Sequence, residues 1–301
     1  MDCGKTFKWK SLMDRILISL PVHERPDIVR DQIENIQYFC PNAIVCIHVS
    51  NGANDDISAF ERACDLPGVI VNPRRYDTIY SKGILHTHIS NFECAVIQGI
   101  EFDKVMLLSS NEMLVKPGLP EHVSRFELGA QTEAFDLSID WHVFHRGLLQ
   151  DVRIKGFLQE LGLPTFFGGQ AEGQFFSREI FTFLHGLYTR HFPMAPGGFE
   201  TEEVLPATIA GYYSILGKDA TLPVSLCDYC TLLKVDTGVV DVVRRGTGSL
   251  VSMKYPRALR SPHHNASTLA GAFSVKRVPR EDCDLRRYIR GLEQVSATAP
   301  A

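Results

Sequence analysis

Short apolar segments alternate with amphipathic segments through the first 112 residues, and this order limits the fold more than any other feature. Four apolar runs have the length of buried strands and lie at residues 15–21, 43–49, 69–72 and 104–108. Three segments between them carry apolar residues at helical spacing, at residues 28–39, 55–64 and 84–100. Strands that alternate with helices form βαβ units, with helices over both faces of the sheet. The sequence therefore predicts an α/β fold with a mostly parallel sheet flanked by helices.

The periodicity is weaker beyond about residue 120, although it still indicates helices. Four further helices are predicted, at residues 148–161, 178–187, 202–216 and 284–292. Residues 237–274 are rich in Gly, Ser, Arg and His and predict an extended loop. The chain shows no internal repeat and no linker composition, so we expect a single domain with two halves, residues 1–120 and 121–295.

The composition limits the classes of partner and the compartment. Of 301 residues, 45% are hydrophobic, which is enough for a packed core. The 31 basic and 35 acidic residues give a net charge of −4, so the chain lacks the basic character of a general nucleic-acid-binding protein. No apolar run approaches the roughly 20 residues of a membrane span, and the first residues do not form a signal peptide. We expect a soluble cytoplasmic protein.

The cysteines agree with a reducing compartment. Six of the eight are scattered, several of them within apolar runs, as is typical of buried reduced thiols. Cys227 and Cys230 form one C-x-x-C pair. A structural zinc site needs four ligands, and no second pair stands at a suitable spacing. We interpret these two residues as ordinary thiols.

Common ligand-binding motifs are absent. No glycine-rich dinucleotide motif follows the first strand, and the chain has no P-loop, nucleophile elbow or H-E-x-x-H motif. Ligands of open parallel sheets bind beyond the carboxyl ends of the strands, so the loops after the four strands are the candidate site. These loops carry eight candidate residues, Pro21, His23, Ser50, Asn51, Arg74, Ser110, Asn111 and Glu112. Ordinary loop roles, such as a turn at residues 50–52, remain alternatives for them.

Histidines supply a few further candidates. His86 and His88 are separated by one residue on a predicted helix, so they face apart and do not form a metal pair. His88 or the nearby Asn91 is a candidate for the ligand pocket. His263 and His264, in the basic loop, are candidates for contact with phosphate.

Four segments carry a resemblance to a known family. They are Ile16-Leu-Ile-Ser-Leu-Pro-Val-His23, Val105-Met-Leu-Leu-Ser-Ser-Asn-Glu112, Glu172-Gly-Gln-Phe-Phe-Ser-Arg178 and Glu202-Glu203-Val-Leu-Pro-Ala-Thr208, with a shorter likeness at Phe273-Ser-Val-Lys-Arg277. They resemble the GT-A nucleotide-sugar glycosyltransferases, in particular the core-2/I-branching β-1,6-N-acetylglucosaminyltransferase family and its bacterial and viral relatives. The resemblance implies a GT-A-like, Rossmann-type fold. Residues 1–120 would bind the nucleotide sugar, and residues 121–295 would bind the acceptor and carry catalysis.

The resemblance also bears on how the donor is held. The eight loop residues named above would bind the nucleotide sugar together with Lys276 and Arg277. Many GT-A enzymes hold a divalent metal with an Asp-x-Asp motif after the fourth strand, where this chain has Ser110-Asn111-Glu112. The core-2 family uses no metal and neutralises the diphosphate with Arg and Lys, which implies that no cofactor is required. The alternatives are a Mn²⁺ or Mg²⁺ ion held by Glu112, and a solvated basic turn at Lys276, Arg277 and Arg280.

Inverting sugar transfer needs a carboxylate that removes the proton of the acceptor hydroxyl. Glu203 is the candidate base, with Glu202 as the near alternative and Glu200 as the third. Acidic residues at a helix start also compensate the helix dipole, which is the structural alternative. Glu172, beside a glycine, is the candidate for hydrogen bonds to acceptor hydroxyls, and an ordinary surface acid is its alternative.

The resulting hypothesis is a glycosyltransferase of polysaccharide biosynthesis. It would move a hexose or N-acetylhexosamine from a nucleotide-activated sugar, with a UDP-sugar as the first choice, to a glycan acceptor. We expect inversion at the anomeric carbon, although retention is left open. The rival is a non-catalytic nucleotide- or glycan-binding protein on the same scaffold, which the missing Asp-x-Asp keeps open. Neither nucleic acid nor a membrane span is expected, and peripheral contact with a membrane and the oligomeric state are left open.

Overall fold

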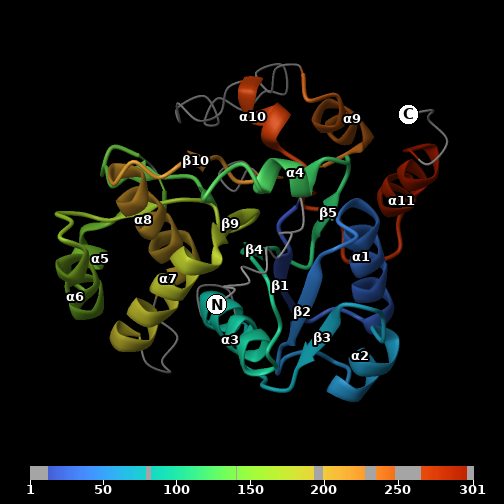
Figure 1. The fold of residues 1–301 in the computed structure, drawn as a ribbon, viewed down its shortest axis with the longest axis horizontal. Helices are drawn as coiled ribbons and strands as arrows, with labels where there is room; N and C mark the ends of the chain where they lie inside the picture. The colour runs from blue at the N-terminus through green and yellow to red at the C-terminus, as the bar shows by residue number, and fades with distance from the viewer. Residues whose placement is uncertain are drawn as a thin grey trace, which may run out of the picture.

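The computed structural model describes residues 13–78, 83–139, 141–192, 199–227, 235–247 and 266–296. Its centre is a seven-stranded sheet in the order β10-β6-β9-β4-β1-β2-β3 (Figure 1). The strands, in chain order, are β1 (Ile16–Val22), β2 (Ile44–Val49), β3 (Val69–Asn72), β4 (Lys104–Leu107), β6 (Leu128–Gly129), β9 (Gln174–Ser177) and β10 (Ala220–Thr221). Strand β9 alone runs antiparallel to both of its neighbours, β4 and β6. The predicted mostly parallel α/β sheet is confirmed.

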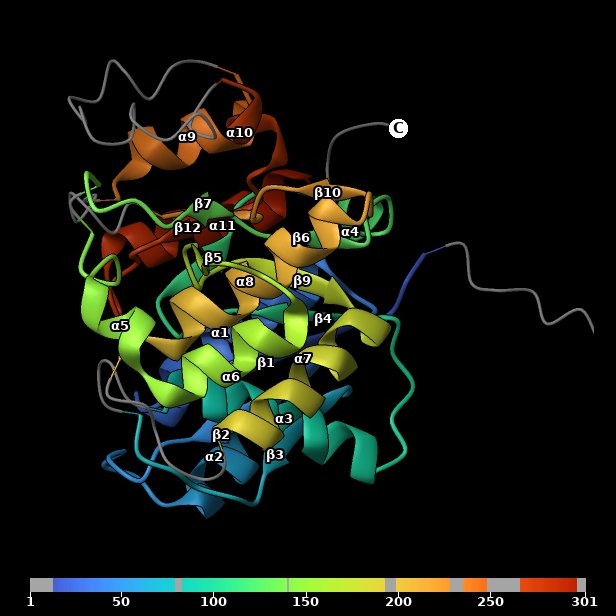
Figure 2. The same ribbon diagram turned by 90° about the vertical axis from the view of Figure 1, so that its left-hand side faces the viewer.

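Alternate residues of the central strands enter two different cores. Leu17 of β1 packs into the core under α3 (Ile84–Ile97), α7 (Arg178–His191) and α8 (Thr201–Ile215). Ile16 and Ile18 pack into the opposite core under α1 (Pro26–Phe39) and α2 (Ile57–Ala63). Figure 1 shows these helices on the two sides of the sheet, and Figure 2 shows α3, α7 and α8 in front of it. Burial on both faces explains why these strands are apolar runs rather than alternating patterns.

The first strand extends one residue beyond the predicted end at Pro21. Strand β4 pairs with β1 only from Ile16 to Ser19, so Pro21 lies beyond the end of that ladder. On the other side Pro21 is in register with His48 of β2. A proline has no backbone N–H that could donate to a neighbouring strand. Because the pairing with β4 ends at Ser19, Pro21 leaves no hydrogen bond to β4 unmade.

Two predictions for the second half need correction. Residues 148–161 form two helices, α5 (Arg146–Gln150) and α6 (Val152–Leu161), because the Asp151 side chain accepts a hydrogen bond from Arg153 N at 2.8 Å and caps the second one. The extended loop predicted at 237–274 contains α9 (Thr237–Arg245) and α10 (Ala266–Gly271). Valines bury one face of α9, at Val239, Val240 and Val243. Their low helix propensity and the shortness of α9 hid this helix from pattern analysis.

A second, three-stranded sheet lies beyond the central one. It consists of β11 (Ser225–Leu226), β12 (Ser274–Lys276) and β5 (Glu112–Leu114), in that order. Helices α9 and α11 (Asp284–Ser296) pack with it in a third core. The short helix α4 (Leu119–Val123) follows β5, and the strands β7 (Glu133–Ala134) and β8 (Phe167–Gly168) form a separate pair. Because β5 follows β4 directly, this sheet brings the C-terminal segment back to the carboxyl end of β4.

Candidate functional site

A cavity of about 460 Å³ lies beyond the carboxyl end of β4. The turn after β4 contributes Ser109 and Asn111 to its lining. The first turn of α8 contributes Glu202 and Glu203, and the end of β12 with the segment after it contributes Lys276, Arg277 and Arg280. Acids and bases that are far apart in the sequence thus meet in one space. We call this space the central cavity.

Glu202 is the most strongly buried acid of the central cavity. It is 4% exposed, and its Oε2 atom has no hydrogen-bond partner in the part of the chain that the structure describes. Burial raises the pKa of Glu202 from 4.5 to about 8, and the neighbouring acids Glu203 and Glu200 add to the rise. The folded protein therefore holds this carboxyl group mainly in its protonated form at neutral pH.

Glu203 stands in a more polar environment than its neighbour. Its Oε2 atom accepts a hydrogen bond from Trp141 Nε1 at 3.1 Å and lies 3.3 Å from His142 Nε2. The hydrogen bond with Glu203 raises the pKa of His142. Two polar hydrogen-bonding partners on one carboxylate oxygen fix the orientation of the Glu203 side chain. The two adjacent acids thus stand in different environments, because an indole and an imidazole hold Glu203 Oε2 while Glu202 Oε2 has no hydrogen-bond partner among the described residues.

The basic residues of the central cavity differ in how far they are neutralised. Lys276 forms a close ion pair with Glu172, and its burial lowers its pKa to about 8. Arg280 Nε lies 2.6 Å from Glu24 Oε1. Within the described residues, Arg277 is exposed and makes no ion pair. Glu172 is thus a partner of a lysine as well as a lining residue of the cavity.

Glu112 and Ser110 lie behind the central cavity rather than on its lining. Glu112 is 1% exposed and accepts hydrogen bonds from Ser109 N at 2.6 Å and from the hydroxyl group of Ser225. Burial raises the pKa of Glu112. Ser110 Oγ donates to Glu24 Oε1 at 2.6 Å. Both side chains hold the turn after β4 in place.

The described residues contain no group of three or more His, Cys, Asp or Glu side chains that could hold a metal ion. The donor set around Glu112 consists of serine hydroxyls and one backbone amide, and Lys276 stands opposite it in the β5–β12 register. A nearby ammonium group opposes a divalent cation at this position. Glu112 is therefore a poor fit for the Mn²⁺ or Mg²⁺ ligand that the sequence left open.

The candidate residues after β1 and β2 do not line the central cavity. Pro21 lies within β1, and His23 Nε2 stands 3.3 Å from Glu24 Oε1. Ser50 Oγ accepts hydrogen bonds from Gly52 N at 3.3 Å and from Thr78 N at 3.2 Å, which is the turn role given as its alternative. Asn51 is exposed in the same turn.

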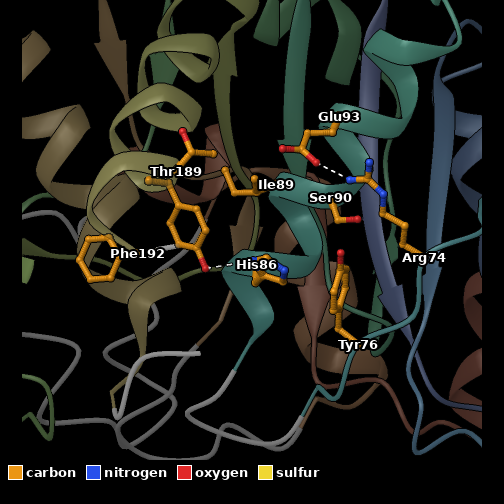
Figure 3. A pocket seen from close by; sticks show the side chains of 9 residues that line it. Arg74, Tyr76, His86, Ile89, Ser90, Glu93, Thr189 and Phe192 are labelled. Carbon is orange, nitrogen blue, oxygen red and sulfur yellow. Dashed lines mark hydrogen bonds and ion pairs between the residues drawn. The ribbon is translucent and has the colours of Figure 1, made fainter. Parts of the chain in front are cut away.

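Arg74 lines a different cavity, of about 170 Å³, between the segment after β3 and helices α3 and α7. Figure 3 shows Arg74 and Glu93 facing one another, with their Nη1 and Oε2 atoms 2.5 Å apart. Glu93 also lies 2.9 Å from His185 Nε2, which completes a charge network between the helices. Arg74 is thus already neutralised, and the structure does not bring it together with the basic residues of the central cavity.

The two histidines of α3 line different cavities, as expected for residues one position apart on a helix. His88 lines the central cavity, and burial lowers its pKa to about 3, so the ring is neutral. His86 lines the cavity of Figure 3, where its Nδ1 atom is 3.3 Å from the Tyr188 hydroxyl. Asn91 is buried and donates to Ser19 Oγ at 3.0 Å. His263 and His264 lie outside the described residues.

Sequence reasoning missed Trp141 and His142, which contact Glu203. They lie in a segment without helical or strand periodicity, so no pattern placed them on an element. The available signal was chemical, since a tryptophan next to a histidine combines two hydrogen-bonding rings. Six cysteines lie in the described residues without a disulfide, and five of them are buried, Cys40, Cys46, Cys64, Cys94 and Cys227.

No protein-family model matches the sequence, and no curated protein matches it. Among solved structures, the chain is similar to galactosyltransferase LgtC in complex with donor and acceptor sugar analogs, with a TM-score of 0.39, 11% identity and coverage of 95% of this chain and 97% of that one. It is also similar to a nucleoside-diphosphate-sugar pyrophosphorylase from Vibrio cholerae RC9, with a TM-score of 0.40, 9% identity and coverage of 69% and 91%. Both TM-scores are too low to support an argument about function. No described helix is long and apolar enough to cross a bilayer.

Proposed function

We propose that this protein transfers a hexose or N-acetylhexosamine from a nucleotide-activated sugar, with a UDP-sugar as the first choice, to a glycan acceptor. The observation that carries the proposal is the central cavity, where the acidic start of α8 meets the basic segment after β12 at the carboxyl end of a parallel strand. Open α/β sheets bind ligands at this edge. The volume of about 460 Å³ is suited to a small organic ligand.

The basic segment would bind the diphosphate of the donor. The Arg277 guanidinium group, unpaired within the described residues, is available for phosphate oxygens. Lys276 and Arg280 would exchange their present carboxylate partners for the diphosphate as the donor enters. Positive charge at this position stabilises the leaving nucleoside diphosphate as the bond to the sugar breaks.

Glu203 would act as the general base. The acceptor oxygen attacks the anomeric carbon, its proton passes to the Glu203 carboxylate, and the bond between sugar and diphosphate breaks with its electron pair on the diphosphate. Trp141 and His142 would hold the Glu203 carboxylate oriented for this step. Glu202 remains the alternative base. In its protonated form it would instead donate a hydrogen bond to a sugar oxygen.

The second candidate is a nucleotide- or glycan-binding protein without catalysis. The ion pairs of Lys276 with Glu172 and of Arg280 with Glu24 favour it, since they neutralise two of the three cations before any donor is bound. A turnover assay separates the two functions. A cytoplasmic location, membrane contact and independence from a metal stay predictions.

Binding and turnover of the Glu203→Gln variant test the proposal. UDP and a panel of UDP-sugars should raise the melting temperature of the wild-type protein, because a ligand of the native state stabilises it. The Glu203→Gln variant should keep this shift and lose transfer by about 10²-fold or more, the usual contribution of a general base. Glu179→Gln is the matched control, since Glu179 is exposed in the first turn of α7.

Three outcomes would change or overturn the proposal. If neither UDP nor any other nucleotide of the panel shifts the melting temperature, the central cavity is not a donor site. If Glu203→Gln retains full turnover while Glu202→Gln loses it, the base is Glu202. Donor binding without turnover of any sugar would favour the non-catalytic function.

A further inference from the structure

A second large cavity, of about 450 Å³, lies between helix α4 and the ends of α9 and α10, and it shares no lining residue with the central cavity. Figure 1 shows α4 below α9 and α10, which together form this part of the molecule. Its charged lining residues are Lys116, Arg125, Arg244, Arg245 and Glu121. Four cations therefore face a single acid among the described residues. We call this space the basic pocket.

No acid of the described residues neutralises the arginines of the basic pocket. Within the described chain, Arg125, Arg244 and Arg245 make no ion pair, whereas Arg287 and Arg290 on α11 each pair with acids. Asp241, one turn before Arg245, accepts a hydrogen bond from the Tyr288 hydroxyl at 2.6 Å. The last turn of α9 is a favourable place for cations because of the helix dipole. The dipole does not explain why Lys116 and Arg125 converge on the same space.

Lys116 is a cation held in place by the fold. The residue is 9% exposed, and its Nζ atom donates to the carbonyl oxygens of Leu269 at 3.0 Å and Ala270 at 3.1 Å. The same atom stands 4.7 Å from the centre of the Phe273 ring. Two of its three hydrogens are used within the described residues, and the third is directed to no acceptor among them. A pre-oriented ammonium group binds an anion with less loss of side-chain entropy than a mobile surface lysine.

His122 adds a polar atom without a partner. Its Nε2 atom is buried and makes no hydrogen bond in the part of the chain that the structure describes. The ring lies against Phe273, with the centroids 5.1 Å apart. A buried polar atom without a partner is costly, so a ligand or water that satisfied it would be favoured.

We propose that the basic pocket binds the phosphate group of an anionic ligand, independently of the donor site. Guanidinium groups match the geometry of phosphate oxygens, and several converging cations favour a phosphate ester over a single carboxylate. The pocket is wide enough for a phosphate with an attached polyol. Such a group occurs in soluble phosphate esters and in the headgroups of anionic lipids.

Titration with inorganic phosphate and with glycerol 3-phosphate, followed by calorimetry at low salt, tests the site. The affinity should fall about tenfold or more in the double variant Arg244→Gln and Arg245→Gln, and again in Arg125→Gln, because each removes charged hydrogen bonds. Arg287→Gln, which replaces an exposed arginine on α11, is the matched control and should bind as the wild type does. Since Arg125 lies outside α9, its variant keeps the test valid if the double variant unfolds.

Variants of the two cavities distinguish this site from the donor site. The double variant should retain the stabilisation by UDP, and Arg277→Ala should retain the binding of glycerol 3-phosphate. Loss of that binding in Arg277→Ala alone would overturn the proposal and assign the phosphate to the central cavity. Equal affinity in the wild type and in both basic-pocket variants would also overturn it.

Vesicles identify the source of the phosphate. Sedimentation with phosphatidylglycerol vesicles but not with phosphatidylcholine vesicles, lost in the double variant, would support a lipid headgroup. Binding of glycerol 3-phosphate without sedimentation would support a soluble ester. If neither inorganic phosphate, nor glycerol 3-phosphate, nor phosphatidylglycerol binds, the pocket is not a phosphate site.

Discussion

The buried carboxyl group of Glu202 should make the stability of this protein depend on pH in a defined way. In the unfolded chain this group ionises near its ordinary pKa of 4.5, whereas in the folded protein burial raises the pKa to about 8. Between these two values the folded state binds more protons than the unfolded state, so the free energy of unfolding falls as the pH rises. The contribution is fully present below pH 4.5 and is lost once the pH exceeds 8.

The pKa values define the size of this effect. One pKa unit corresponds to about 1.4 kcal/mol, so the rise from 4.5 to about 8 corresponds to about 5 kcal/mol in total. Most of that falls between pH 5 and pH 9, where the contribution changes by about 4 kcal/mol. Glu202→Gln, which keeps the shape and removes the ionisable group, should abolish it. The variant should be close to the wild type at pH 5 and more stable by several kcal/mol at pH 9.

Urea unfolding of both proteins at pH 5, 7 and 9, followed by circular dichroism, measures the difference in the free energy of unfolding. Other titrating groups, such as Glu112, are present in both proteins and largely cancel in the difference. Glu179→Gln, which replaces an exposed acid at the start of α7, should show no pH-dependent difference. A difference for Glu202→Gln that varies by less than about 0.5 kcal/mol, the usual effect of a surface substitution, would refute the argument from burial.

Two further predictions concern the catalytic arrangement. A Cβ atom at Gly168 would lie 2.5 Å from the Trp141 ring, so Gly168→Ala should cost roughly 1–3 kcal/mol of stability and displace the residue that donates to Glu203. Transfer activity should fall well below that of Gly291→Ala, a control substitution into open space on α11, and equal activity of the two variants would refute the role of Trp141. If the proposed mechanism holds, turnover should survive excess EDTA, because the basic segment would supply the positive charge at the diphosphate. Loss of turnover that Mn²⁺ restores would assign a metal to the site and make Glu112 the first residue to test.

The first half of the fold could be predicted because its signals are local. Strands β1, β2 and β4 are buried on both faces, so each is a continuous apolar run with few polar interruptions, and the partly buried edge strand β3 is a short apolar run of the same kind. Ser19 is one of these interruptions, and it anchors His88 and Asn91 at the centre of the sheet. Helix α9 could not be predicted in the same way, because its three valines are buried only by packing against the core of the small sheet, which the sequence does not show.

The candidate site could likewise be predicted only in part from the sequence. The acidic start of α8 and the basic pair at Lys276 and Arg277 were named from the sequence, and the structure brings them to one cavity. The structure does not bring Arg74 there, because Glu93 on the facing side of α3 neutralises it in another cavity. The sequence does not show which acid a charged loop residue will contact, because that depends on how the elements pack together.

The sequence by itself determined the class of fold and the chemical types available to a site. The spacing of apolar residues indicates which side chains are buried, and it can be recognised within a short window of the sequence. Only the tertiary structure decided which acids meet which bases, that burial raises the pKa of Glu202, and that Lys116 and the arginines of α9 converge. These properties depend on burial and on distances between segments far apart in the chain, because both the cost of desolvation and the Coulomb energy are set by three-dimensional surroundings.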